Sequence, residues 1–579
     1  MHHRPIVLVV CCLLLAWFSA PVPASAAAPS AELLRLVPDD VAFCLVVQDL
    51  RGHSRSLLDS PFLERLRASK LGAALRAAPE LGKLADVEKH FQDLLGITWS
   101  ALRDDILGDA VVLAYRLGPN GQEDQEQGLF LLRARNEKSL AALIERLNAV
   151  QKKSGDLKTV EERGHNGRSY FRRGERKGAN FYYLRGPVLV FSTREEMLRQ
   201  ALDLDVKAAP AEKEPPPISR SLRQLGAEQA LAALWINPAA FAAELQRKTA
   251  SARGAEGHFL KTFGNYWKAL QGVVVHVTLR QDFELALSLQ MKADELPAAG
   301  RRFFTEAARP SDLWSSFGDN PLLAIAGRTD APALVAFLSD FFSDDARKVV
   351  SLVVDSNLRT VLGKDLAAEV LPCIGPDWGV CITAPPATDK GWAPYLIAAL
   401  RVRPGDGESG VDRALYTALN FLAVMLVLDH NSKHADQMAL KSSTHDKVEI
   451  KFLVNDKGYP PGLQPAFALK GGYLVLASSP EAIRRFSPSS SRAADPGRSE
   501  VPLLRISLVA LRSYLKERRD QLSVYVAEKN QITKEEATRR LNDLLAGLEL
   551  FDRLDLTQRT SLSQATWTLR VRTAAALRK

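Results

Sequence analysis

The chain has 579 residues, of which 46% are hydrophobic and 25% charged, and it carries a formal net charge of +9. This length exceeds what one small core can organise and predicts several domains, while the composition is that of an ordinary globular protein. The mild positive charge favours an anionic partner, such as an envelope polymer or a membrane surface. It argues against a nucleic-acid binder, because the charge is spread along the chain and not gathered in one patch.

The first 26 residues have the three parts of a secretory signal peptide. Arg4 gives a basic start, residues 6–18 form an apolar core, and Ala24-Ser25-Ala26 is a small-residue cleavage site. We therefore expect an exported protein of the periplasm, the cell envelope or the extracellular space, cleaved near Ala26. An uncleaved N-terminal anchor is the alternative. A later apolar run, Leu422–Leu428, is interpreted as part of a buried core helix and not as a membrane span.

Beyond the signal peptide the chain has only Cys44, Cys373 and Cys381. Such scarcity excludes the disulfide framework of a small secreted domain. Cys44 lies in an apolar strand pattern, where burial as a small hydrophobic residue is expected. Export would permit Cys373 and Cys381 to pair, and the sequence leaves that pairing open.

A first domain is predicted over residues 30–204 from alternating helical and strand patterns. Its expected elements are a strand at 41–47, helices between 56 and 107, strands at 110–117 and 129–134, a helix at 137–151, a hairpin at 169–173 and 180–185, and a helix at 195–204. A Pro-rich linker, 205–217, follows. The second domain, 218–300, is expected to contain a strand at 231–236, helices at 238–247 and 259–270, and strands at 273–279 and 283–291.

The same order of patterns then recurs over residues 310–486 and 501–575. One stretch shows it most directly, because it is used twice, at 182–193 and 467–478. In both copies a strand ends at a glycine turn, an apolar strand follows, and Ser or Thr offers an N-cap for a helix with acid in its first turn. We predict an α+β protein of two tandem duplicated lobes, each with a mostly antiparallel sheet and packed helices.

These features resemble an uncharacterised family of large exported bacterial proteins that is catalogued as a domain of unknown function. The likeness is carried by Pro38-Asp39-Asp40 before the first strand, by Leu107-Gly108-Asp109 before an apolar strand, and by the repeated Gly-x-x-Leu-Val element. It covers most of the chain after the signal peptide. The resemblance implies a location in the cell envelope and brings no active-site residues.

The sharpest candidate for a contact surface is the hairpin between residues 168 and 185. Its basic and aromatic members are suited to an anionic lipid, glycan or polymer, and they are Arg172, Arg173, Arg176, Lys177, Tyr182 and Tyr183. The alternative is a charged, solvated turn whose aromatic side chains face the sheet.

The histidines gather in one place, where His430 and His434 are four residues apart and His445 follows. Two histidines at this spacing on a helix share a face, which suits zinc. The segment is polar, however, and lacks the glutamate of an H-E-x-x-H motif, so a solvated loop is the competing interpretation.

No nucleophile elbow, Walker loop or C-x-x-C motif occurs in the sequence, and no cofactor is expected. The hypothesis is a non-enzymatic, exported cell-envelope protein that acts in binding or as a scaffold, with its ligand unknown. The alternative is a metal-dependent hydrolase that uses His430, His434 and His445.

Overall fold

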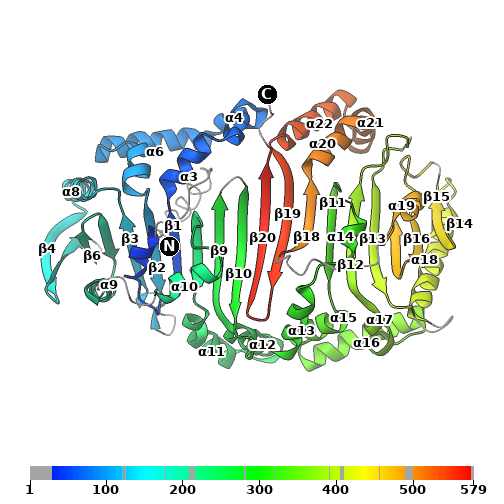
Figure 1. Cartoon of the computed structure of the whole chain (residues 1–579), viewed down its shortest axis with the longest axis horizontal. Helices are drawn as coiled ribbons and strands as arrows, with labels where there is room; N and C mark the ends of the chain where they lie inside the picture. The colour runs from blue at the N-terminus through cyan, green and yellow to red at the C-terminus, as the bar shows by residue number, and fades with distance from the viewer. Residues whose placement is uncertain are drawn as a thin grey trace. The chain divides into compact units, whose positions relative to one another are not determined.

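Figure 1 shows the computed structural model of the whole chain. It describes residues 29–574, apart from residues 120–121, 123–124, 177, 208–214, 280–281, 319, 390, 405–409, 456 and 489–499. The predicted signal peptide and the central part of the predicted linker 205–217 therefore lie outside the described residues.

The chain divides into two compact units. Unit 1 comprises residues 1–248, 267–291 and 573–579, and unit 2 comprises residues 249–266 and 292–572. Both units contain helices and strands in quantity, and the predicted α+β class is confirmed.

The sheet of unit 1 has the strand order β10-β9-β8-β1-β2-β3-β7-β6-β5-β4, and neighbouring strands pair antiparallel. Its strands are β1 (Phe43–Gln48), β2 (Ala110–Arg116), β3 (Gln127–Arg133), β4 (Leu157–His165), β5 (Arg168–Glu175), β6 (Gly178–Arg185), β7 (Val188–Ser192), β8 (Ala232–Ile236), β9 (Leu270–Leu279) and β10 (Phe283–Met291).

The helices of unit 1 connect these strands and cover the sheet. They are α2 (Ser30–Leu34), α3 (Leu50–Leu58), α4 (Pro61–Ala68), α5 (Lys70–Arg76), α6 (Pro79–Leu95), α7 (Trp99–Ala101), the π-helix η1 (Leu102–Ile106), α8 (Glu137–Ser154), α9 (Glu195–Lys207), α10 (Pro217–Gln224), the 3-10 helix η4 (Pro238–Phe241) and α11 (Ala242–Ser251), whose last turn passes into unit 2.

The sheet of unit 2 has the order β20-β19-β18-β11-β12-β13-β17-β16-β15-β14. Its strands are β11 (Leu323–Arg328), β12 (Ile374–Thr383), β13 (Tyr395–Val402), β14 (Ala439–His445), β15 (Val448–Val454), β16 (Ala466–Lys470), β17 (Tyr473–Ala477), β18 (Val501–Ser507), β19 (Phe551–Thr560) and β20 (Gln564–Thr573).

The helices of unit 2 are α12 (Gly254–Lys268), α13 (Ala298–Ala307), α14 (Leu313–Ser316), α15 (Ala331–Ser339), α16 (Asp344–Leu362), the π-helix η5 (Leu366–Val370), α17 (Leu371–Cys373), α18 (Val411–Lys433), α19 (Pro480–Arg485), α20 (Leu508–Glu517), α21 (Arg519–Asn530) and α22 (Lys534–Leu548). In Figure 1, α20, α21 and α22 lie beyond one end of the strands and α13, α15, α16 and α17 beyond the other, while α18 and α19 lie alongside the strands.

The two units have the same strand order when each strand of unit 1 is matched to the strand ten numbers later in unit 2. Smaller features agree as well. A long helix, α6 or α16, ends at a glycine in the left-handed conformation, Gly96 (φ 63°) or Gly363 (φ 65°). A single π-helix then precedes the equivalent strands β2 and β12. This is the arrangement that a duplication predicts, and common ancestry of the units is our proposal.

The repeated apolar stretch of unit 1 is buried on both faces of its sheet. In β7, Val188 and Val190 point into a core that also contains residues of α2, α9 and α10, whereas Leu189 and Phe191 point into a second core beneath α8. Because successive side chains of a strand alternate between faces, a strand covered on both sides needs a continuous apolar run.

Two strands were not anticipated, β4 and β14, which form the outer edges of the two sheets. Their side chains are mostly exposed and polar, so neither carries the period-two apolar pattern by which a strand is predicted.

Cys373 and Cys381 do not pair in the structure, because Cys44, Cys373 and Cys381 are all free thiols. Burial raises the pKa of Cys44 and of Cys381 to about 12.

Candidate functional site

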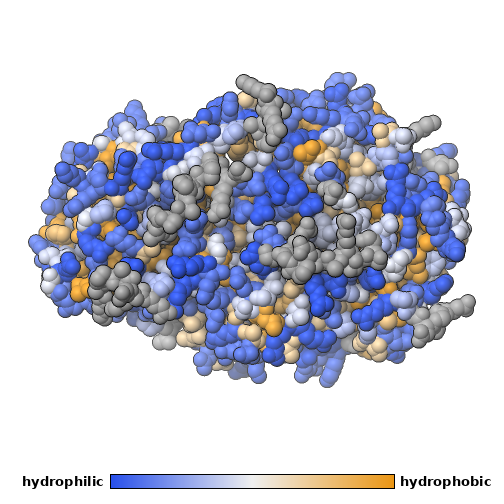
Figure 2. Space-filling model, viewed as in Figure 1, coloured by the Kyte–Doolittle hydropathy of each residue, from blue (hydrophilic) through white to orange (hydrophobic). Residues whose placement is uncertain are grey.

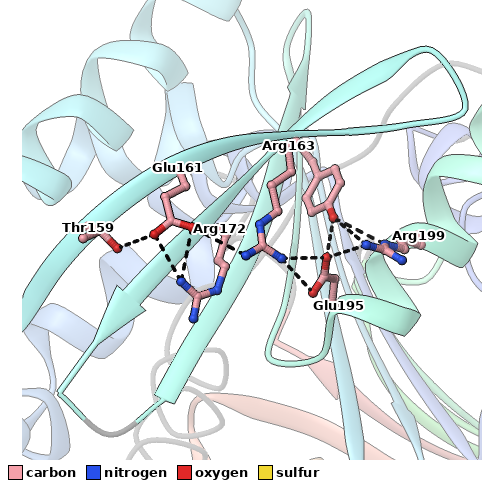
Figure 3. A network of polar contacts seen from close by, with 7 residues as sticks. Thr159, Glu161, Arg163, Arg172, Glu195 and Arg199 are labelled. Carbon is pink, nitrogen blue, oxygen red and sulfur yellow. Dashed lines mark hydrogen bonds and ion pairs between the residues drawn. The ribbon is translucent and has the colours of Figure 1, made fainter.

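The predicted basic hairpin exists as β5 and β6, with β4 on its outer side. On this outer side Glu161 of β4 accepts hydrogen bonds from the Thr159 hydroxyl at 3.2 Å and from Arg172 Nη1 at 3.4 Å. The Thr159 hydroxyl, followed by Arg172, holds the pKa of Glu161 below its usual range. Arg172, a predicted ligand-binding residue, is thus paired within the protein (Figure 3).

The same network continues to the first turn of α9. Glu195 accepts hydrogen bonds from Arg163 Nη1 at 3.2 Å and from Arg199 Nη2 at 2.7 Å (Figure 3), and the fully buried Tyr170 also donates its hydroxyl to it. Burial raises the pKa of Glu195, but the bonds from Tyr170, Arg199 and Arg163 outweigh it and hold that pKa below its usual range. This network ties β4 and β5 to helix α9, which is a structural role.

The remaining hairpin residues do not form one exposed surface. Arg173 is buried, donates to Gln151 of α8, and has its pKa lowered by that burial. Tyr182 and Tyr183 are only 6% and 3% exposed, because they occupy opposite faces of a strand that is covered on both sides. Arg176 is exposed at the turn, and Lys177 lies outside the described residues. The geometry favours the alternative of a charged turn whose aromatic side chains face the sheet.

The predicted histidine cluster is divided by the fold. His430 belongs to the last turns of α18, where its Nε2 lies 3.2 Å from Asp436 Oδ2 and 3.1 Å from Asn455 Nδ2, and its ring stacks on that of His434 at 4.6 Å. The segment is therefore helical up to Lys433 and not the expected loop.

His445 lies at the far end of β14, about 20 Å along the strand from the end that follows the helix. Within the part of the chain that the structure describes, no group of three or more His, Cys, Asp or Glu side chains is placed to hold a metal ion. The arrangement thus does not assemble the metal site of the hydrolase alternative.

Sequence reasoning missed the most unusual surface, which is on α18. One stripe of this helix, formed by Tyr416, Leu419, Ala423 and Val427, packs against a core that includes Phe467 of β16. The side chains of the opposite face are large, apolar and 39–59% exposed, and they are Phe421, Leu422, Val424, Met425, Leu426 and Leu428. We call these six residues the outer face of α18.

The prediction that Leu422–Leu428 belongs to a buried core helix is therefore wrong. A helix at a protein surface normally has polar residues opposite its buried stripe, but α18 is apolar on both sides. Figure 2, viewed as in Figure 1, shows hydrophobic residues reaching the surface among hydrophilic ones in the area of α18. The signal was the uncharged run of residues 414–428, which is long enough to surround the helix with apolar side chains.

The equivalent helix of unit 1 shows what an ordinary surface helix in this position looks like. Helix α8 follows β3 as α18 follows β13, and it buries Leu140 and Leu143. Its exposed positions are polar or small, and they are Glu137, Lys138, Ala142, Glu145, Arg146, Ala149, Lys152, Lys153 and Ser154. The exposed apolar face is thus a property of unit 2 and not of the shared strand order.

Comparison with known proteins adds little to this description. No family model and no curated protein matches the sequence. Among solved structures, crystal form I of TP0453 aligns with 14% identity over 44% of this chain and 77% of that chain, with a TM-score of 0.22. Crystal form III of TP0453 aligns with 14% identity over 45% and 79%, with a TM-score of 0.21. Values this low establish neither a common fold nor a common function.

Proposed function

We propose that this protein is a non-enzymatic, exported cell-envelope protein that acts by binding, or as a scaffold, through the outer face of α18. The exposure of six large apolar side chains on one helix face carries this proposal. Contiguous apolar surface of this kind is costly in water and marks interaction sites on folded proteins.

The charged groups of the other candidate surface support the same conclusion. The predicted binding arginines Arg172 and Arg173 are paired within unit 1, and the carboxylates Glu161 and Glu195 are held ionised by their partners. These groups stabilise the fold, whereas no part of the chain that the structure describes covers the side chains of the outer face of α18. Support for export comes from the sequence of residues 1–26.

Fractionation of cells that produce the full-length chain tests the proposal. We expect the protein in the envelope fraction, with a mass that corresponds to cleavage near Ala26. The variant F421Q/M425Q/L428Q removes three exposed apolar side chains and should move to the soluble exported fraction. The control V509Q/V524Q/L544Q alters three exposed residues of α20, α21 and α22 and should stay with the envelope.

Two results would contradict this function. A full-length chain found only in the cytoplasm would exclude export. If the variant F421Q/M425Q/L428Q stays in the envelope fraction to the same extent as the unmodified protein, the outer face of α18 is not the binding surface.

A further inference from the structure

We propose that the partner of the outer face of α18 is a lipid bilayer, and that the helix lies in the plane of the membrane surface with this face among the upper acyl chains. The inference rests on the proposed function and names the partner that it leaves open. It is carried by the dimensions, polarity and charge of α18.

The dimensions of α18 suit a membrane surface. With 23 residues, it is the one helix among the described residues that is long and apolar enough to cross a membrane. Its length is about 35 Å. Because Leu419, Ala423 and Val427 hold its inner stripe on the core of unit 2, the helix presents one side to lipid and does not span.

Apart from the exposed hydroxyl of Thr417, the outer side of α18 has little with which a protein partner could form specific hydrogen bonds. Between Arg413 and Asp429 the helix carries no charged residue, and Asn420 already accepts a hydrogen bond from Lys451 at 2.8 Å. A protein interface normally forms about one hydrogen bond per 100–200 Å². Hydrocarbon makes no hydrogen bonds, and the backbone groups of a helix are satisfied within the helix, so this face is suited to acyl chains.

The charges of α18 stand where lipid headgroups would be. Arg413 is exposed near one end and Lys433 at the other, and the exposed Asp429 pairs with Lys433 at 2.6 Å. Long basic side chains at the ends of an apolar segment reach the headgroup layer. Since these charges nearly balance, the attraction comes from apolar burial, and binding should require neither anionic lipid nor low salt.

A helix in contact with α18 also exposes apolar side chains. Helix α16 contacts α18, and its Val349 and Leu352 are 61% and 72% exposed. The charged residues near them are of both signs, because Arg347 and Lys348 are exposed and so are Asp344 and Asp345, and Arg347 pairs with Asp344.

Flotation of the mature full-length chain with vesicles of neutral phosphatidylcholine tests this inference, at low salt and at about 1 M salt, where the Debye length is about 3 Å. We expect the same fraction of the protein to float with the vesicles at both salt concentrations. Transfer of each half-exposed large side chain from water into lipid should raise the affinity for the vesicles about five-fold. The variant F421Q/M425Q/L428Q, which loses three such side chains, should therefore bind about 100-fold more weakly. The control V509Q/V524Q/L544Q and the apolar variant F421L/M425L/L428M should bind as the unmodified protein does.

Far-UV circular dichroism and melting curves establish that the variants are folded, and mass measurement in lipid-free solution detects self-association. No flotation with neutral vesicles, loss of flotation at high salt, or equal flotation of F421Q/M425Q/L428Q would each overturn the inference. So would a lipid-free dimer that this variant dissociates, because a second copy would then occupy the face. If neutral vesicles fail while envelope retention still depends on α18, the bilayer is excluded and the proposed function stands.

Discussion

Glu195 makes more polar interactions than the residues next to it in the sequence. It receives hydrogen bonds from Tyr170, Arg163 and Arg199, whereas the adjacent Glu196 is exposed. Replacement of Glu195 by Gln removes the charge that these donors share, and we expect E195Q to lose about 1–2 kcal/mol in the free energy of unfolding. E196Q should change it by less than about 0.5 kcal/mol. Chemical denaturation measures both values.

The pH dependence of this loss follows from the lowered pKa of Glu195, whose ordinary value is 4.5. A carboxylate with a lowered pKa in the folded state stabilises the protein above its unfolded-state value and ceases to do so as the pH falls through its folded-state value. The difference in the free energy of unfolding between E195Q and the unmodified protein should therefore become smaller below about pH 4.5. A loss equal to that of E196Q at neutral pH would contradict the structural role of the network.

Two buried histidines make unit 1 sensitive to mild acid. His53 and His276 are 9% and 8% exposed, and burial lowers the pKa of each below its ordinary 6.5. Because the unfolded chain binds protons more readily between the lowered pKa and 6.5, the free energy of unfolding should fall as the pH drops below 6.5. The slope is at most about 1.4 kcal/mol per pH unit for each histidine.

The variants H53Q and H276Q should each flatten this dependence, measured by urea denaturation between neutral pH and mild acid. The exposed His90 provides the matched control, and H90Q should leave the slope unchanged. A slope that neither H53Q nor H276Q reduces would show that other groups titrate in this range.

The three thiols that the structure describes differ in access to reagents. Cys44 and Cys381 are buried with their pKa raised to about 12, whereas Cys373 is partly exposed. Since the thiolate is the reactive form, a thiol reagent should modify Cys373 first in the native protein and all three residues after denaturation. Rapid native labelling of Cys44 or Cys381, located by peptide mass, would contradict this burial, and a disulfide would contradict the free thiols.

At the scale of elements, the two copies of the repeated hairpin differ at their turns. Gly186 and Gly471 both have a positive φ, 54° and 58°, where a side chain is strained. A Cβ added at Gly186 meets no atom within 4 Å, but one added at Gly471 would lie 2.3 Å from Pro488 Cγ. We expect G186A to cost about 1 kcal/mol, the strain of the conformation alone.

G471A should cost more than G186A, because Pro488 or the turn must also move. Urea midpoints at an unchanged denaturant slope give the comparison. Equal costs at the two turns would indicate that the segment around Pro488 yields freely.

The sequence allows an element to be predicted where the element's own pattern decides its environment. The apolar runs of β7 and β17 specify strands locally, and both strands lie where the sequence predicts them. After β17, Ser479 caps α19 as predicted, and its side chain accepts a hydrogen bond from the Ala482 N–H. The edge strands β4 and β14 could not be predicted in this way. Most of their residues are exposed and polar, so the sequence shows no apolar pattern that indicates a strand.

The candidate site shows the opposite case, because burial there depends on distant parts of the chain. Tyr182 and Tyr183 looked like exposed aromatics beside arginines, but two separate cores cover the two faces of their strand. Leu422–Leu428 looked like a core segment, but no described element covers its outer half. Hydropathy reports how apolar a segment is, and only the fold shows which side of it is covered.

At the scale of the whole molecule, two units with one strand order carry different surfaces. Helix α8 of unit 1 is polar on its exposed side, and α18 of unit 2 is apolar there. Both units therefore share a strand order, and the proposed binding surface belongs to unit 2 because only α18 has an apolar exposed side. The net charge of +9 is spread over the chain and, on this account, contributes less to binding than α18 does.

The most direct test is to ask whether the outer face of α18 enters lipid. In a chain of residues 27–579 with Cys373 replaced by Ser, the substitution M425C provides the attachment site for an environment-sensitive fluorophore. In the control chain, L544C on α22 provides that site. With neutral vesicles that carry nitroxide groups on their upper acyl chains, emission at position 425 should shift to the blue and be quenched, while position 544 is unaffected. Emission at position 425 that stays characteristic of water when vesicles are added would contradict the account.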